Sequence, residues 1–330
     1  MASLSFYKRR IASTGSLQKI FRAQELIATS RIRVAKENAE ATTPYSNEIE
    51  TALSLAFRSV EDLEHPLITP TKTNRVGILI LTSDRGMAGP FNSGILRQVD
   101  MLSKKLLSEQ KKLDLYVTGR RGVSYFNFRA VPLKGNWVGQ SEHPNYDLAK
   151  TIGETLIKDM LPSSNATFSH TNNRLDEIYV VYALFKNMVV QTPSITRLLP
   201  LKISNSNSGN TQTSNSQDSN ENNSRTTGNY SGVNGSDKTN SIYIFEPSLK
   251  EILDELLKRY IYTRINHLLF ESAASETASR QRAMHTANDN ANDLLELLTR
   301  QMNQARQSNI TNELNEIVGA ANALKQGQDQ

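Results

Sequence analysis

Cysteine is absent from the 330-residue sequence, and tryptophan occurs once. Without cysteine the chain can form no disulfide, no thiolate nucleophile, no cysteine-ligated zinc site and no iron–sulfur cluster. The five histidines show no pair at the i, i+4 spacing of a metal-binding helix and no neighbouring acids at ligand spacing. No nucleophile–base arrangement can be argued either. These absences predict a chain with no catalytic, metal or cofactor site of its own.

Long apolar runs are also missing. No window approaches the roughly 18 consecutive apolar residues of a membrane-spanning helix. The first twenty residues carry Lys8, Arg9, Arg10 and Lys19 without the apolar core of a signal peptide. We therefore expect a chain that faces the cytosol and does not insert into a membrane. An arginine-containing, acid-poor start could also mimic a mitochondrial transit peptide, but its helical periodicity runs past residue 30 without a processing-like break.

Proline and glycine are scarce at the N-terminal end. Residues 1–43 contain one glycine, Gly15, and no proline. Apolar side chains recur at Ile20, Ala23, Ile27 and Val34, the spacing of a helical stripe. Helical density resumes after Pro44, so the sequence predicts an N-terminal shaft helix over residues 1–64, which Pro44 could kink.

The positive charge of the chain is concentrated in this helix. Glu25 is the one acidic residue among the first 36, against eight basic ones: Lys8, Arg9, Arg10, Lys19, Arg22, Arg31, Arg33 and Lys36. Such a helix could bind nucleic acid or an anionic lipid surface, or it could be a solvated basic face. A thin basic rod would also fit inside a ring of acidic partner surfaces, which is the interpretation that we favour.

The C-terminal part predicts a second, longer helix. Residues 248–318 contain neither proline nor glycine, and at about 1.5 Å per residue they would form a helix of roughly 100 Å. Its second half carries a narrow seam with steps of three and four, close to a coiled-coil repeat: Met284, Ala287, Ala291, Leu294, Leu298, Met302 and Ala305. The sequence therefore predicts a C-terminal shaft helix over residues 248–325. It would form an antiparallel or crossed coiled coil with residues 1–64, or alternatively an intermolecular one.

Between the two helices, the pattern is typical of an α/β (Rossmann-like) domain over residues 74–203. Short β-branched or aromatic runs at 76–82, 113–117, 178–184 and 195–203 alternate with helical spacing at 95–107, 122–128 and 146–161. The sheet should be largely parallel.

Residues 204–240 are rich in asparagine and serine and predict a disordered insertion. Residues 241–247 predict the last strand of the domain, which could pair with the strand before the insertion.

The turn at residues 82–92, Thr-Ser-Asp-Arg-Gly-Met-Ala-Gly-Pro-Phe-Asn, is the most enzyme-like feature. It follows a predicted strand and opens a helix, where backbone N–H groups could hold a phosphate. However, it lacks the lysine of a P-loop and the dinucleotide-binding spacing, and Pro90 removes one donor. We favour a structural turn in which Asp84 and Arg85 pair or cap. A nucleotide-binding α/β enzyme is the alternative.

Several segments together resemble the gamma subunit family of the F-type ATP synthase, over nearly the whole chain. The resemblance is carried by residues 1–13 and 22–30, by Pro44-Tyr45, by the turn at 81–92, by 191–194 and 198–200, and most specifically by 303–318. The sequence departs from the family pattern at Ala88, at Pro90 and at Gly319-Ala320, and the insertion at 204–240 lies outside the resemblance.

This resemblance implies a central rotor stalk that couples transmembrane proton flow to ATP synthesis or hydrolysis at the catalytic sites of the beta subunits. It implies a non-catalytic subunit without cofactors, located at the cytoplasmic side of the cell membrane as a peripheral protein. Its partners would be the alpha, beta and epsilon subunits and the membrane c-ring, with no nucleic acid. By motif, Arg306 and Gln307 would contact beta catch loops, while Lys8, Arg9 and Arg10 would lie near an acidic beta lever region. The alternative function is a nucleic-acid-associated coiled-coil scaffold.

Overall fold

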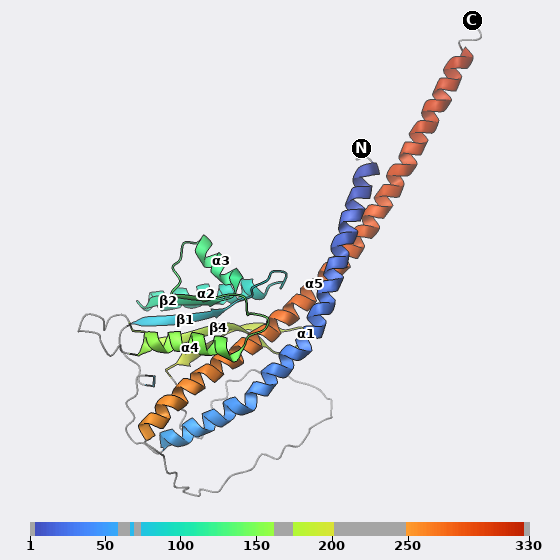
Figure 1. Cartoon of the computed structure of the whole chain (residues 1–330). Helices are drawn as coiled ribbons and strands as arrows, with labels where there is room; N and C mark the ends of the chain where they lie inside the picture. The colour runs from blue at the N-terminus through green and yellow to red at the C-terminus, as the bar shows by residue number, and fades with distance from the viewer. Residues whose placement is uncertain (1–3, 59–66, 69–73, 162–173, 201–248, 327–330) are drawn as a thin grey trace, which may run out of the picture.

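The fold consists of a long two-helix shaft and an α/β domain that lies against its lower half (Figure 1). The computed structural model describes residues 4–58, 67–68, 74–161, 174–200 and 249–326. The shaft helices are α1 (Leu4–Arg58) and α5 (Leu249–Gln326). The predicted insertion at 204–240, the predicted strand at 241–247 and the predicted helical residues 59–64 lie outside the described residues.

Helices α1 and α5 pack against each other in antiparallel orientation. The amide of Gln18 donates to Asn292 Oδ1 at 2.6 Å, and Glu25 lies 2.9 Å from His285 Nδ1. Further down, Thr42 lies 3.2 Å from His267 Nδ1, so partners in α5 descend as positions in α1 ascend. The start of α1 and the end of α5 consequently lie at the same end of the shaft, and α5 extends beyond α1 (Figure 1). The structure confirms the intramolecular antiparallel coiled coil.

The α5 side of the seam agrees with the sequence prediction. Met284, Ala291 and Leu298 are buried. The other four predicted positions, Ala287, Leu294, Met302 and Ala305, are partly buried. A three-and-four spacing in the sequence therefore identified the face of α5 that contacts α1.

The apolar residues whose spacing predicted a helix at the N-terminal end do lie in a helix, but they do not form its buried face. Ile20, Ile27 and Val34 are 49%, 43% and 45% exposed, and Ala23 is exposed as well. The buried positions follow a different three-and-four spacing: Thr14, Ala28, Ile32, Ala35, Ser46, Ile49, Leu53 and Ala56. Several of these buried side chains are small or polar, which allows the two helices to approach closely. The larger apolar side chains lie on the outer face, so hydrophobicity alone does not identify the buried face of α1.

The domain contains a five-stranded sheet in the order β3-β2-β1-β4-β5. The strands are β1 (Arg75–Leu81), β2 (Lys112–Thr118), β3 (Gly135–Trp137), β4 (Glu177–Phe185) and β5 (Gln191–Leu199). The first four are parallel, and β5 runs antiparallel to β4, so the largely parallel α/β sheet is confirmed. The three-residue strand β3 was not predicted, because it is too short to show a period.

Helices cover both faces of the sheet, and α5 is one of them. Helices α2 (Phe91–Ser108) and α3 (Arg120–Phe128) enclose one core with Ile78 and Ile80. Helix α4 (Tyr146–Met160) and the lower parts of α1 and α5 enclose the other with Leu79 and Leu81. Alternate side chains of β1 thus enter opposite cores, as a pleated strand requires. The lower half of α5 is therefore part of the domain, while its upper half is shaft.

At Gly153, helix α4 packs closely against α5. A Cβ atom at this position would lie 2.4 Å from Cδ1 of Tyr262. We expect Gly153→Val to lower the free energy of unfolding by about 1–3 kcal/mol, because the added carbons would push α5 away from α4. Thermal unfolding of the full chain measures this loss.

The matched control is Gly15→Val in α1, where an added Cβ meets nothing within 4 Å. Valine is a slightly better helix former than glycine, so this variant should unfold at or slightly above the wild-type midpoint. Equal midpoints for the two variants would contradict the close packing of α4 on α5.

Candidate functional site

The sequence-predicted contact residues lie together at the upper end of the shaft. Lys8, Arg9 and Arg10 are exposed on α1, and Arg306 and Gln307 are exposed on α5 next to the partly buried Ala305. Continuing the pairing of Gln18 with Asn292 along both helices brings Leu4 level with Arg306. The two predicted groups therefore occupy neighbouring turns of the same rod, although they come from opposite ends of the chain.

Beyond this level α5 continues as a single helix. Every residue from 309 to 319 is exposed. This stretch carries four large apolar side chains that are 45–65% exposed: Ile310, Leu314, Ile317 and Val318. Exposed apolar side chains that gather on one helix end are typical of a surface that a partner covers.

The turn between β1 and α2 is held by its own side chains. Asp84 accepts hydrogen bonds from the backbone N–H groups of Arg120, Gly139 and Ser141 at 2.8–3.0 Å. Burial alone would raise the pKa of the Asp84 carboxyl, but these three hydrogen bonds hold the pKa below its usual value. Asp84 thus fastens this turn to the start of α3 and to the loop after β3.

Side chains also bond within the same turn. The backbone N–H of Ser83 donates to Asn92 Oδ1 at 3.0 Å, and the side-chain amide of Asn92 donates to Ser83 Oγ at 2.7 Å. The guanidinium of Arg121 lies over Gly86, where it would come within 2.3 Å of an added Cβ. The backbone N–H groups of Ser83 and Asp84 and the side-chain amide of Asn92 are therefore bonded to neighbouring side chains, as expected of a structural turn.

A partly buried cluster of charged side chains lies where shaft and domain meet. Glu142, in the loop before α4, is surrounded by three guanidinium groups: Arg31 of α1 at 2.5 Å, Arg280 of α5 at 3.2 Å and Arg85 of the β1–α2 turn at 3.6 Å. Arg280 also pairs with Glu276 one helical turn away, at 2.6 Å. We call these five residues the Glu142 junction.

The centre of the Glu142 junction is largely removed from water, while Arg31 and Arg85 reach it from the surface. The side chains of Glu276, Arg280 and Glu142 are only 1%, 7% and 12% exposed. Burial raises the pKa of Glu276, and the guanidinium of Arg280 opposes that shift. Nearby, Ser279 Oγ donates to the carbonyl of Ala88 at 2.7 Å. One carboxylate thus links both shaft helices to the domain, through a short, charge-assisted hydrogen bond from Arg31 and ion pairs with Arg280 and Arg85.

Sequence reasoning missed this junction. The available signal was the run Ser275-Glu-Thr-Ala-Ser-Arg280, in which charged and hydroxyl residues interrupt the wide apolar face of α5. Its partners Arg31 and Glu142 are distant in sequence, and Arg31 was assigned only to the general basic face.

We expect Glu142→Gln to lower the free energy of unfolding by about 1–3 kcal/mol, because an amide cannot neutralise three surrounding guanidinium groups. The thermal midpoint of the full chain measures the loss. The matched control is Glu296→Gln, since Glu296 pairs with Arg300 on the shaft surface, where both side chains are well over half exposed. That variant should stay within about 0.5 kcal/mol of wild type. Similar losses in both variants would show that the junction adds no more stability than a surface pair.

None of the helices in the described ranges combines the length and apolar character that a membrane span requires. Within the same ranges, no three histidine or acidic side chains gather as potential metal ligands.

Comparison with known proteins identifies the family. The family model described as ATP synthase matches residues 3–324. The chain is 40% identical to an ATP synthase gamma chain from Nocardioides sp. over 99% of this chain and 98% of the relative. It is 41% identical to the one from Bifidobacterium animalis subsp. lactis over 100% of both chains.

A solved structure shares the fold. A chain in the central stalk and c-ring of the Tetrahymena thermophila mitochondrial ATP synthase matches with a TM-score of 0.53 and 19% identity, covering 81% of this chain and 99% of that one. Another, from the Euglena gracilis mitochondrial ATP synthase, matches with a TM-score of 0.52 and 14% identity, covering 96% of this chain and 97% of that one. From its full-length relatives, the chain belongs to the ATP synthase gamma chain family, whose members are the non-catalytic central-stalk subunit of the F-type ATP synthase.

Proposed function

We propose that the upper shaft turns inside a ring of alpha and beta subunits and couples transmembrane proton flow to ATP synthesis or hydrolysis at the beta sites. The carrying observation is the shape of the molecule: a thin shaft that ends in a bare, exposed stretch of α5 projects from an α/β domain (Figure 1). The domain would stand on the c-ring with the epsilon subunit, at the cytoplasmic side of the cell membrane, as a peripheral part of the complex.

Asymmetry of the shaft supplies the mechanism. Near its upper end α1 stops and α5 continues alone, so the rod presents different side chains to each side of a surrounding ring. A ring subunit that meets Arg306 and Gln307 makes different contacts from one that meets Lys8, Arg9 and Arg10. Such differential contacts favour different conformations of the subunits in turn, so rotation would be linked to nucleotide affinity.

Torque must pass between the domain and the shaft, and two features provide for this. The lower half of α5 is buried in the domain core, so domain and shaft share one continuous helix. The Glu142 junction additionally attaches α1 to the domain through Arg31. We therefore assign torque transfer to these two connections.

The distribution of ion pairs along α1 supports the proposal that acidic partner surfaces surround the end of the shaft. Within the described residues, Arg31, Arg33 and Lys36 pair with Glu142, Glu37 and Glu40. Towards the chain end, no ion pair within the described ranges neutralises Lys8, Arg9, Arg10, Lys19 or Arg22. Within α1, the unpaired positive charge thus lies in the part that a ring would enclose, which favours the rotor over a scaffold that binds nucleic acid along the whole length of this helix.

Replacing both Arg306 and Gln307 with alanine should reduce ATP synthesis and ATPase turnover in the assembled complex, because the proposed contacts to beta are removed. The helicity of the isolated chain should remain nearly unchanged, since alanine is the better helix former. Turnover and circular dichroism measure the two effects. Arg259→Ala, an exposed position near the opposite end of α5, is the control and should keep normal turnover. Normal turnover in the double variant would contradict the proposed contact.

Changing Lys8, Arg9 and Arg10 together to glutamine should weaken assembly with alpha and beta subunits or lower the coupling ratio. The effect should grow at high ionic strength, where the remaining attraction is screened. The control changes three exposed basic residues of α2 instead, Arg97, Lys104 and Lys105, and so removes equal charge elsewhere. Unimpaired assembly of the shaft variant, together with loss of DNA affinity by the free chain, would favour the nucleic-acid scaffold.

A further inference from the structure

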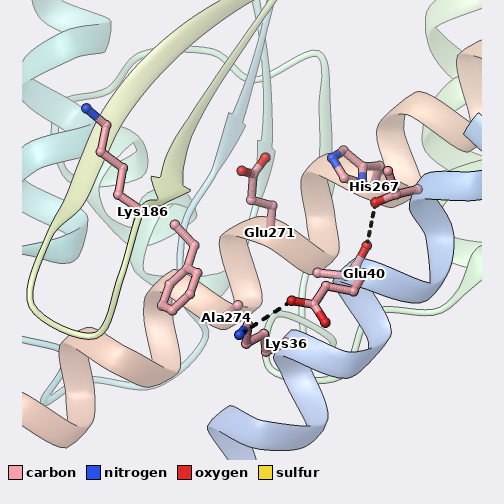
Figure 2. A pocket seen from close by; sticks show the side chains of 9 residues that line it. Lys36, Glu40, Lys186, His267, Glu271 and Ala274 are labelled. Atoms are coloured by element: carbon pink, nitrogen blue, oxygen red, sulfur yellow. Dashed lines mark hydrogen bonds and ion pairs between the residues drawn. The ribbon is translucent and has the colours of Figure 1, made fainter. Parts of the chain in front are cut away.

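A cavity of about 270 Å³ lies between α1, α5 and the end of β4 (Figure 2). Helix α1 contributes Lys36 and Glu40, and α5 contributes His267 and Glu271. The chain at and just after the end of β4 adds Phe185 and Lys186. Its apolar lining comes from the Phe185 ring together with Ala39 and Ala274. The cavity therefore touches both shaft helices and the sheet at once.

The charges in this cavity are unequally satisfied. Lys36 and Glu40 form an ion pair at 3.5 Å, and the amine of Lys186 is turned away from Glu271 (Figure 2). His267 contacts Thr42 at 3.2 Å. The half-buried carboxylate of Glu271 forms no hydrogen bond or ion pair within the described residues. This acceptor lines the same cavity as the Phe185 ring, and no cation of the described residues lies within ion-pair distance of it; Arg264 acts on it only from farther away.

We propose that this cavity binds a small organic cation with a flat apolar body, whose charged group pairs with Glu271 and whose body packs against Phe185. A planar amidinium or guanidinium suits the carboxylate, because it can donate two parallel hydrogen bonds. A metal ion suits the site less well, since no three histidine or acidic side chains converge anywhere in the described residues. This binding site is separate from the proposed shaft contacts, so the two proposals can fail independently.

The environment of Glu271 predicts how such binding depends on pH. Burial raises the pKa of Glu271 to about 7, and Arg264 opposes the shift. The other charged groups around the cavity are Lys36 and Glu40 from α1 and Lys186 after β4. Burial lowers the pKa of His267, and Arg264 adds to this shift. A bound cation requires the ionised carboxylate, so affinity should rise as pH increases through 7 and level off above it.

The test uses the full-length chain with benzamidine as the probe and benzamide, its neutral analogue of the same shape, as the comparison. Calorimetric titration should show saturable benzamidine binding that is about tenfold tighter at pH 8 than at pH 6, as a single carboxyl with a pKa near 7 requires. Benzamide should bind at least tenfold more weakly at pH 8. No saturable benzamidine binding, or equal binding of both compounds, would overturn the proposal.

Glu271→Gln identifies the responsible group, because it keeps the shape of the side chain and removes its charge. This variant should bind benzamidine at least tenfold more weakly at pH 8, and most of the pH dependence should vanish. The matched control, Glu296→Gln, changes an exposed glutamate of the same helix outside the cavity and should bind as wild type does. Wild-type affinity in Glu271→Gln would refute the assignment. If that variant does not fold, the pH series and the benzamide comparison on the wild-type chain still decide.

Discussion

The continuity of α5 is the constraint on which the rest of the structure depends. Its first half packs in one core with the sheet, α4 and α1, and its second half continues along α1 as the upper shaft. If the domain rotated and the upper shaft did not, hydrogen bonds within α5 would have to break or that core would become exposed. The domain and the upper shaft must therefore rotate together. The close packing of α4 on α5 at Gly153, together with the surrounding apolar residues, holds α5 directly against the domain.

Helix α1 is attached in a different way. Beside the domain core its contacts are apolar, with Ile49 and Leu53 buried, but higher up it meets the domain through Arg31 and Glu142. An apolar contact tolerates small sliding movements, whereas three guanidinium groups around one carboxylate favour a single geometry. The Glu142 junction therefore fixes the orientation of α1 relative to the domain at the level where the shaft leaves the domain.

The seam of the shaft explains why so much apolar surface faces outward. Small and polar residues such as Thr14, Ala28 and Ala35 occupy the inner face of α1, so the two helices approach closely and the rod stays thin. Larger side chains such as Ile20 and Ile27 are consequently left on the outer face. Together with the bare end of α5, they form an outer surface that has both apolar and positive character, which suits a close-fitting partner more than open solvent.

The sequence by itself determined the elements whose signal is local. Spacing of three and four located the α5 seam, the absence of proline and glycine gave its length, and short β-branched runs located four of the five strands. Only the tertiary structure decided which face of α1 is buried, since that choice depends on how closely α5 can approach. It also brought Arg31, Glu142 and Arg280 together and left Glu271 beside a cavity, because these contacts join residues separated by long stretches of chain. The physical reason is that periodicity reports on one element at a time, while charge pairing and burial are properties of several elements packed against each other.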